Sequence, residues 1–344
     1  MLAAIGPSFI GYGPFTMPCQ TKHPSHSRFL PVCEFPSFLP KEVDNIKDPF
    51  ARKLASRIER VPVQGSFLNG SIMSSCVKPM VQSETNPLVL LHGFDSSCLE
   101  WRYTLPLLEE AGLETWAVDI LGWGFSDLTR LPSCGVASKR DHLYQFWNTY
   151  IKRPMTLVGP SLGAAVAIDF VSSYPEAVDK LILIDASCYA EGTGDLAKLP
   201  RILAYAGVYL LKSIPLRLYA TSLAFNGLPV DTCRDWTNIG RLHCLLPWWE
   251  DATVDFMISG GYNVVAQIEH VKQKTLILWG ENDQIIDKKL AVRLHSEVPN
   301  AILRQIPECG HIPHVEKPNA VSKLIVEFIE QNARQSIYAP SSSL

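Results

Sequence analysis

The chain has 344 residues, of which 47% are hydrophobic and 19% are charged, and its formal net charge at pH 7 is −3. This composition predicts a folded, soluble protein and excludes a disordered, collagen-like or fibrous chain. The net negative charge leaves no basic excess to neutralise a phosphate backbone, so the composition disfavours nucleic acid as a partner.

Residues 1–44 are predicted to be a transit peptide or a disordered extension. The first 33 residues contain no Asp or Glu, and five prolines prevent a helix of useful length. Glycines and prolines also break the one apolar stretch, which disfavours a secretory signal. An acid-free, polar segment is typical of organelle transit peptides, and its single arginine, Arg28, suits a mitochondrial presequence poorly. We therefore expect a chloroplast protein, with the cytoplasm as the alternative.

From residue 45 onward, apolar strands alternate with helices. Phe50, Leu54 and Ile58 are spaced by four and predict an amphipathic helix. Strands are expected at residues 61–68, 72–77, 87–91, 115–120, 155–158, 181–184, 275–279 and 302–306. Most are continuous apolar runs, as in strands buried on both faces. Helical patterns lie at residues 99–111, 142–151, 161–174 and 319–332. The alternation predicts an α/β fold with a parallel sheet covered on both faces.

The alternation stops over residues 186–269, which we expect to be a helical cap inserted into a core of residues 45–185 and 270–333. The longest apolar run of this stretch, residues 202–211, stops at Lys212, whereas a membrane-spanning helix needs about 20 residues. A transmembrane segment is therefore not expected. The aromatic side chains of the cap are expected to line an apolar pocket, and the ones singled out are Trp236, Trp248, Trp249 and Phe256. Residues 334–344 are expected to be a disordered tail.

The nine cysteines are scattered and form no CxxC pair and no metal-finger spacing. This pattern predicts a reducing compartment without a disulfide framework. We expect no metal site and no cofactor.

Residues 159–163 read GPSLG and fit the G-x-S-x-G pattern of a nucleophile elbow. A buried strand precedes the motif and a helix of small residues follows it, which is the context that the elbow requires. The two glycines permit the tight, strained turn that presents a serine hydroxyl at the carboxyl edge of the sheet. Ser161 is therefore the predicted nucleophile, and an ordinary glycine-containing turn is the alternative.

A serine nucleophile needs a base and an orienting acid. His311 follows the last strand and is the predicted base, with His314 as the local competitor. Asp283 lies in the sequence GEND after the strand at residues 275–279, and it completes the order Ser, Asp, His. Glu281 and Asp185 remain open as alternatives for the acid. Asp283 has the further alternative of only capping the next helix.

Two backbone amides are expected to stabilise the oxyanion that forms during the reaction. They are the amide of Leu162, directly after the nucleophile, and the amide of Phe94, after His92 and Gly93. His92 is expected to hold this loop, because His311 fills the role of base better. Asp119 and Asp127 are likewise expected to order a loop, since their strand lies upstream of the elbow.

The motifs, taken in order, resemble those of the α/β-hydrolase superfamily. They are HGF at His92, DILGWGFSD at Asp119, GPSLG at Gly159, GEND at Gly280 and CGHIPHVEKP at Cys309. The resemblance covers about residues 87–332 and implies an eight-stranded, mostly parallel sheet with a helical cap after the sixth strand. The chain is most similar to cap-bearing members such as carbon–carbon bond hydrolases, epoxide hydrolases and haloalkane dehalogenases. The last two use an aspartate at the elbow, where this chain has Ser161.

The sequence therefore predicts a serine hydrolase that cleaves an ester, thioester or activated ketone of a small to medium apolar substrate through an acyl-enzyme. The alternatives are a small-molecule receptor built on the same fold and an acyltransferase with a non-water acceptor. A complete set of Ser161, Asp283 and His311 favours the enzyme, because a receptor has no chemical need for all three. The sequence leaves the oligomeric state open.

Overall fold

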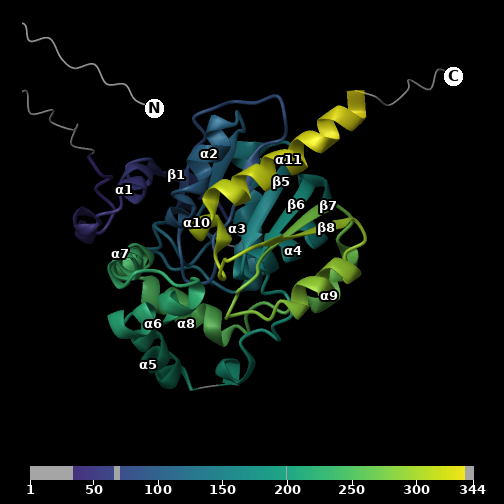
Figure 1. Cartoon of the computed structure of the whole chain (residues 1–344). Helices are drawn as coiled ribbons and strands as arrows, with labels where there is room; N and C mark the ends of the chain where they lie inside the picture. Colours follow the sequence, from purple (N-terminus) through teal and green to yellow (C-terminus); the bar gives the residue numbers. More distant parts are fainter. Residues whose placement is uncertain (1–33, 66–69, 199, 338–344) are drawn as a thin grey trace, which may run out of the picture. The chain divides into compact units, whose positions relative to one another are not determined.

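The computed structural model describes residues 34–65, 70–198 and 200–337, and its eight strands form one sheet in the order β1-β2-β4-β3-β5-β6-β7-β8 (Figure 1). The strands are β1 (Ile58–Gln64), β2 (Ser71–Val77), β3 (Leu88–Leu90), β4 (Thr115–Val118), β5 (Met155–Pro160), β6 (Val178–Ile184), β7 (Lys274–Gly280) and β8 (Ala301–Ile306). Strand β2 is antiparallel to β1 and β4, and all other neighbours are parallel. The predicted eight-stranded, mostly parallel sheet is confirmed.

Helices cover both faces of the sheet. Successive side chains of a strand point to opposite faces, so Val89 and Leu91 pack in one core cluster and Leu88 and Leu90 in the other. The first cluster includes residues of α3 (Val136–Phe146), α4 (Leu162–Ser173) and α9 (Lys289–Glu297). The second includes residues of α1 (Pro49–Ala55), α2 (Thr104–Glu110) and α11 (Pro318–Ile337). Burial on both faces explains why the parallel strands are continuous apolar runs.

The start of the packed chain differs from the sequence prediction. Leu39 and Val43 are buried against the second core cluster, so packing begins before the expected boundary at residue 45. The side chain of Asp48 caps α1 by accepting from the amides of Phe50 and Ala51. The helix predicted to include Ile58 ends at Ala55, because Ile58 already pairs with Val77 in the sheet. That helix prediction was wrong in its extent, and Phe50 is exposed.

The end of the chain differs in a similar way. Helix α11 continues to Ile337, so residues 334–337 of the expected tail are helical. The remainder of that tail, residues 338–344, and residues 1–33 of the expected extension lie outside the described part of the chain. The seven cysteines of the described part are buried free thiols.

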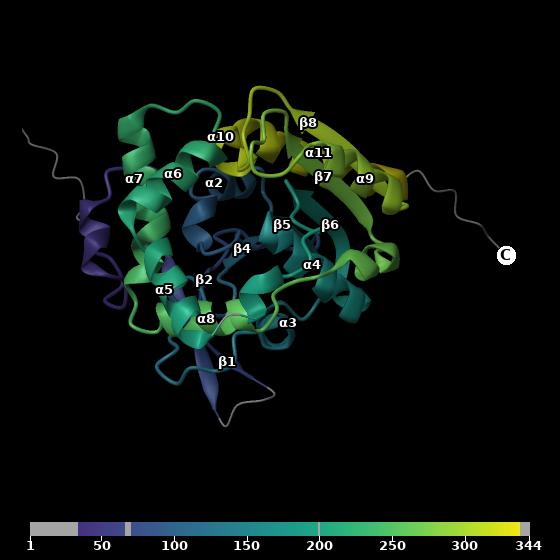
Figure 2. The same ribbon diagram turned by 90° about the horizontal axis from the view of Figure 1, so that it is seen from below.

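Between β6 and β7 the chain forms helices, and the described residues of this stretch contain no strand. The helices are α5 (Arg201–Leu211), α6 (Ile214–Ala224), α7 (Val230–Arg241) and α8 (Trp249–Ile258). Figures 1 and 2 both place α5, α6 and α7 together to one side of the sheet. In the described residues no helix is both long and apolar enough to span a membrane. Two of the inserted helices, α6 and α7, contribute side chains to the cavity described below.

Candidate active site

Ser161 stands at a strained turn between β5 and α4. Its φ is 49° and its ψ is −119°, a conformation that L residues rarely adopt. The turn needs glycine on both sides: a Cβ at position 159 would lie 2.2 Å from the Gly163 carbonyl oxygen, and one at position 163 would lie 2.5 Å from that of His92. This geometry places Ser161 at the carboxyl end of β5, as the elbow motif predicts.

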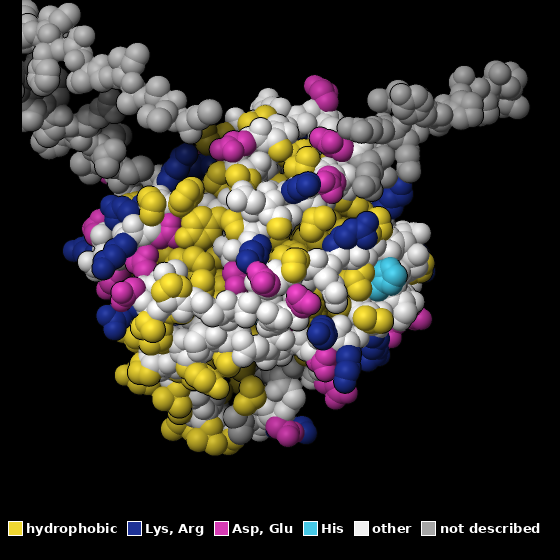
Figure 3. Space-filling view, viewed as in Figure 1, with side chains coloured by type: hydrophobic (Ala, Val, Ile, Leu, Met, Phe, Trp, Pro, Cys, Tyr) yellow, Lys and Arg dark blue, Asp and Glu magenta, His cyan; other side chains and the backbone are white. Residues whose placement is uncertain are grey.

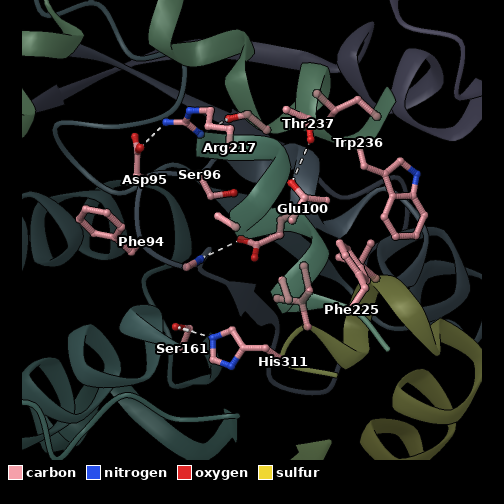
Figure 4. Close-up of a pocket in the computed structure, with 18 of the residues that line it drawn as sticks. Phe94, Asp95, Ser96, Glu100, Ser161, Arg217, Phe225, Trp236, Thr237 and His311 are labelled. Atoms are coloured by element: carbon pink, nitrogen blue, oxygen red, sulfur yellow. Dashed lines mark hydrogen bonds and ion pairs between the residues drawn. The ribbon is translucent and has the colours of Figure 1, made fainter. Parts of the chain in front are cut away.

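His311 links Ser161 to Asp283. Its Nε2 lies 3.0 Å from Ser161 Oγ (Figure 4). Its Nδ1 lies 2.8 Å from Asp283 Oδ2. Burial alone would raise the pKa of Asp283. The pKa nevertheless stays below its usual value, because His311 donates a hydrogen bond and favours the negative charge, and two backbone amides also donate to the carboxylate. An ionised Asp283 keeps a proton on Nδ1 and leaves the lone pair of Nε2 facing the serine hydroxyl.

The alternative acid Asp185 occupies a different position. Its side chain is fully buried after β6, and Oδ1 accepts a hydrogen bond of 2.9 Å from the Gly280 amide. Burial, reinforced by the nearby charge of Asp283, raises the pKa of Asp185 well above its ordinary value. Burial therefore favours the neutral form of Asp185, whereas the contacts with His311 favour the charged form of Asp283.

The other two competitors make different contacts. Glu281 is exposed, and its carboxylate accepts from the Glu308 amide. His314 is buried, with Nε2 3.4 Å from a carboxylate oxygen of Glu100 and its ring 4.5 Å from that of Trp101. Of the candidate bases and acids, His311 and Asp283 are thus the pair whose hydrogen bonds run in line with the serine, and Asp185 lies beside Asp283.

The loop that carries Phe94 lies directly beside the serine. A Cβ at Gly93 would be 3.6 Å from Ser161 Cβ. The Gly93 amide donates to Glu100 Oε2 at 2.8 Å, and this contact fixes the peptide that precedes Phe94. The amides of Phe94 and Leu162, the two predicted oxyanion donors, make no hydrogen bond to another group of the described residues. Both are therefore available to a ligand oxygen.

Buried polar side chains hold this loop. His92 Nδ1 donates to the Gly93 carbonyl at 2.8 Å, and Nε2 accepts from the Ile120 amide at 3.0 Å. Burial lowers the pKa of His92, so the ring is neutral and fits the structural role expected for it. Asp119 accepts from the amides of Cys98 and Phe125 and so orders its own loop.

Asp127, the other aspartate of that motif, accepts from the amide and the hydroxyl of Thr129. Its carboxylate also lies 3.5 Å from the Arg60 guanidinium. These contacts likewise order a turn.

A cavity of about 350 Å³ opens beside Ser161 and His311. Its apolar walls come from Phe94, Leu99, Ala220, Ala224, Phe225, Trp236, Ile239, Ile285, Ile312 and Val315. Figure 4 shows Phe225 and Trp236 on the far side of the cavity from Phe94. The polar walls include Glu100 and the paired Asp95 and Arg217. A cavity of this volume is suited to a small or medium ligand.

Only Trp236 of the four predicted pocket aromatics lines this cavity. Trp249 and Phe256 are buried, the first with its Nε1 donating to Asp95 and the second packed on Trp123 at a ring distance of 5.0 Å. Trp248 is half-buried with the Arg60 guanidinium over its ring. The pocket prediction was therefore wrong for these three residues, because packing within the protein occupies their rings.

Asp95 was missed by the sequence analysis. It directly follows Phe94, has a φ of 50° and is buried. Its carboxylate pairs with Arg217 of α6 and accepts from His243 Nε2 at 2.9 Å and from Trp249 Nε1 at 2.7 Å. One carboxylate therefore ties three parts of the inserted helices to the loop that carries the Phe94 amide. Burial alone would raise the pKa of Asp95, but Arg217 and the two donors hold it at about 2.

Stability should depend on the charge of Asp95. The folded-state pKa of about 2 lies below the ordinary value of 3.8, so ionisation favours the folded state by about 2 kcal/mol. This contribution is complete above the ordinary pKa and is lost as pH falls through about 2. At pH 7, Asp95→Asn should lower the free energy of unfolding by about 3–5 kcal/mol, because the half-buried Arg217 and the buried His243 lose their charged partner.

Urea unfolding of the parent, Asp95→Asn and the exposed control Asp195→Asn at pH 7 and at about pH 3 measures this difference. The loss for Asp95→Asn should be smaller at the lower pH, and Asp195→Asn should change little at either. A loss of the same size at both pH values would contradict the assignment of an ionised Asp95.

The inserted helices also contact the loop of His311. The His311 amide donates to the Ala224 carbonyl at 2.8 Å, at the end of α6. A Cβ at Gly310 would lie 2.5 Å from the same oxygen, so this approach requires glycine. Helix α6 therefore takes part in fixing both His311 and, through the pairing of Arg217 with Asp95, the loop that carries the Phe94 amide.

Within the described part of the chain, two groups of side chains present possible ligand atoms within 4.8 Å of one another, as a metal site would require. They are Asp95, His243 and Cys244, and Asp185, Asp283 and His311. Asp95 already pairs with the cation of Arg217, and Asp283 already binds His311. A bound cation would have to displace these contacts, so both groups fit hydrogen-bonded networks better than metal sites.

Sequence comparison with known proteins finds alpha/beta hydrolases. The sequence profile of the alpha/beta hydrolase family matches residues 88–324. Alpha/beta hydrolase domain-containing protein VTE7 of Arabidopsis thaliana is 64% identical over 298 residues, which cover 86% of this chain and 90% of that protein.

Solved structures of hydrolases share the fold. An esterase from Thermogutta terrifontis superposes with a TM-score of 0.67 at 18% identity, covering 79% of this chain and 98% of the esterase. The meta-cleavage product hydrolase from Pseudomonas fluorescens IP01 superposes with a TM-score of 0.62 at 20% identity, covering 80% of this chain and 98% of that hydrolase.

Proposed function

The chain belongs to the alpha/beta hydrolase family, and on this premise we propose that it is a serine hydrolase for a small to medium apolar ester, thioester or activated ketone. The observation that carries the proposal is the position of His311, within hydrogen-bond distance of both Ser161 Oγ and Asp283. The largely apolar walls of the adjacent cavity support the substrate class. The side chains of the site supply every proton transfer, so the reaction needs no cofactor.

The first half of the reaction forms an acyl-enzyme. His311 Nε2 takes the proton of Ser161 as its Oγ attacks the carbonyl carbon, and Asp283 stabilises the resulting imidazolium. The amides of Phe94 and Leu162 donate to the oxyanion. When the carbonyl re-forms, the bond to the leaving group breaks and His311 delivers its proton to that group. An alcohol, a thiol or a carbon leaving group departs, and the acyl group remains on Ser161.

The second half of the reaction releases the acid. His311 Nε2 now takes a proton from water, whose oxygen attacks the acyl carbon. The tetrahedral intermediate collapses, the bond to Ser161 Oγ breaks, and His311 returns the proton to that oxygen. An acceptor alcohol in place of water would make the same residues an acyltransferase.

Labelling of the full chain with a fluorophosphonate, read by intact mass, tests the proposal. We expect a single adduct on Ser161 and no adduct on the Ser161→Ala variant, because only an activated serine reacts readily. A folded protein that leaves Ser161 unlabelled would contradict the enzyme proposal and favour the receptor alternative.

Trp236 should influence which acyl chain is accepted. Its ring lines the cavity and packs 4.6 Å from that of Phe225. We expect Trp236→Ala to change the ratio of kcat/KM for long and short acyl esters by about tenfold, or about 1.4 kcal/mol of transition-state binding, because it enlarges the cavity.

Trp248→Ala is the matched control, since that ring lies outside the cavity, and it should leave the ratio unchanged. An equal change in both variants, or no change in a folded Trp236→Ala protein, would remove Trp236 from the selectivity determinants. Trp236→Phe provides a milder second variant if the alanine protein does not fold.

We also propose that the protein is imported into chloroplasts, on the composition of residues 1–33 alone. A fusion of the first 45 residues to a fluorescent protein should co-localise with chlorophyll in leaf cells. A diffuse cytosolic signal would favour the cytoplasmic alternative.

A further inference from the structure

The outer side of α5 and α6 carries an exposed apolar surface. Seven of the sixteen exposed large hydrophobic side chains in the described residues lie on α5 and α6. They are Ile202, Leu203, Tyr209, Leu210, Ile214, Leu216 and Tyr219, and we call this set the α5–α6 apolar surface. Figure 3 shows apolar side chains gathered at the lower left, where Figure 1 places these helices. Exposed fractions reach 77% at Ile202, and such concentrated exposure marks an interaction site.

The charges around this surface favour an anionic lipid surface as its partner. Helices α5 and α6 contain no Asp or Glu, and the cations Arg201 and Lys212 stand at the two ends of α5. Lys212 pairs with Glu250 of α8, outside these two helices. An apolar helix face without acids and with flanking cations is typical of helices that lie in the lipid interface. Tyr209 and Tyr219 add amphipathic rings, and tyrosine is enriched at the interface between lipid and water.

Helix α6 also borders the cavity beside Ser161 and His311. Arg217, Ala220, Thr221 and Ala224 of α6 line it, whereas Leu216 and Tyr219 of α6 belong to the exposed surface. A molecule that leaves a bilayer in contact with α5 and α6 would therefore reach the cavity beside Ser161 by passing along α6. A second copy of the chain bound to this surface would instead cover α6 and obstruct that path. This step rests on the proposed function, which takes an apolar substrate.

We propose that the α5–α6 apolar surface docks the protein on a lipid bilayer that contains anionic lipids, and that the substrate enters the cavity from that bilayer. Each of the two helices has 11 residues, about 16 Å in length, so the contact is with the bilayer surface. Docking is reversible, because it uses side-chain burial without a spanning segment.

Flotation of the full chain with vesicles tests this docking. The vesicles contain phosphatidylcholine and phosphatidylglycerol at about 7:3, with pure phosphatidylcholine as the second arm. We expect the parent to float with the mixed vesicles, and the double variant Ile202→Gln with Leu210→Gln to bind at least about tenfold more weakly.

The matched control is Met80→Gln with Val292→Gln, which removes apolar side chains of similar exposure elsewhere on the surface. It should bind vesicles like the parent. Both variants should keep the parent's kcat/KM for a water-soluble ester, because none of the four residues lines the cavity. The α5–α6 variant alone should lose hydrolysis of an ester embedded in the vesicles.

Equal flotation of both variants, or a folded parent that does not float, would overturn the proposal. A dimer seen by light scattering that dissociates in the α5–α6 variant, without vesicle binding by the parent, would assign the surface to a second copy. Flotation requires no hydrolysis, so the two proposals can fail separately. A protein that floats but cleaves no ester contradicts the proposed function only, and one that cleaves soluble ester but does not float contradicts the docking only.

Discussion

Ser161→Ala is expected to lower kcat by about 10⁴-fold or more on any ester that the protein cleaves. The alanine retains the β-carbon and the backbone at a φ of 49° but removes the oxygen that lies 3.0 Å from His311 Nε2. Without that oxygen no acyl-enzyme can form, and the amides of Phe94 and Leu162 remain as the source of any residual rate.

The fold should be unaffected, because Ser161 makes its structural contacts through the backbone. Its amide donates to the Ile184 carbonyl, and its carbonyl accepts from the amide of Ser187. Steady-state kinetics combined with circular dichroism and thermal unfolding measures both effects. Ser173→Ala, at the far end of α4, is the control and should retain activity. A kcat within about tenfold of the parent would exclude Ser161 as the nucleophile.

The sequence predicts the sheet well because its strands are buried on both faces. The run LILI at residues 181–184 falls inside β6, and TLILW at residues 275–279 falls inside β7. Because the carboxyl ends of parallel strands meet at one edge of a sheet, residues that follow different strands lie close together there. Chain position therefore predicts that Ser161, Asp283 and His311 meet, although they are far apart in sequence.

The sequence predicts the boundaries and the cavity walls less well, since these depend on contacts between distant residues. The amides of Lys47 and Asp48 bind the side chain of Asp235, so the N-terminal boundary depends on a residue of α7. Asp95 and Arg217 are 122 residues apart, and no local pattern pairs them. The adjacent Trp248 and Trp249 also differ in burial, and no local pattern predicts this difference. Only packing decides that the first ring is half-buried and the second is buried.

Asp283→Asn is expected to lower kcat by about 10⁴-fold, and Asp185→Asn by less than about tenfold. An asparagine at position 283 cannot carry the charge that stabilises the His311 imidazolium, and its amide group no longer selects the tautomer with a proton on Nδ1. At position 185, burial and the charge of Asp283 raise the pKa of the carboxyl and favour its neutral form, which an asparagine resembles. The asparagine oxygen there can still accept the bond that Asp185 Oδ1 receives from the Gly280 amide.

The two variants make a matched pair, because each replaces a carboxyl by an amide of nearly the same shape at neighbouring strand ends. They differ in which carboxyl binds His311, so comparison of their kcat values separates the two candidate acids. Thermal unfolding must accompany the kinetics, since both carboxyl groups accept backbone hydrogen bonds. A larger kcat loss for a stably folded Asp185→Asn protein would place the acid after β6. Fluorophosphonate labelling should follow the same order, because the reactivity of Ser161 depends on the base that the acid orients.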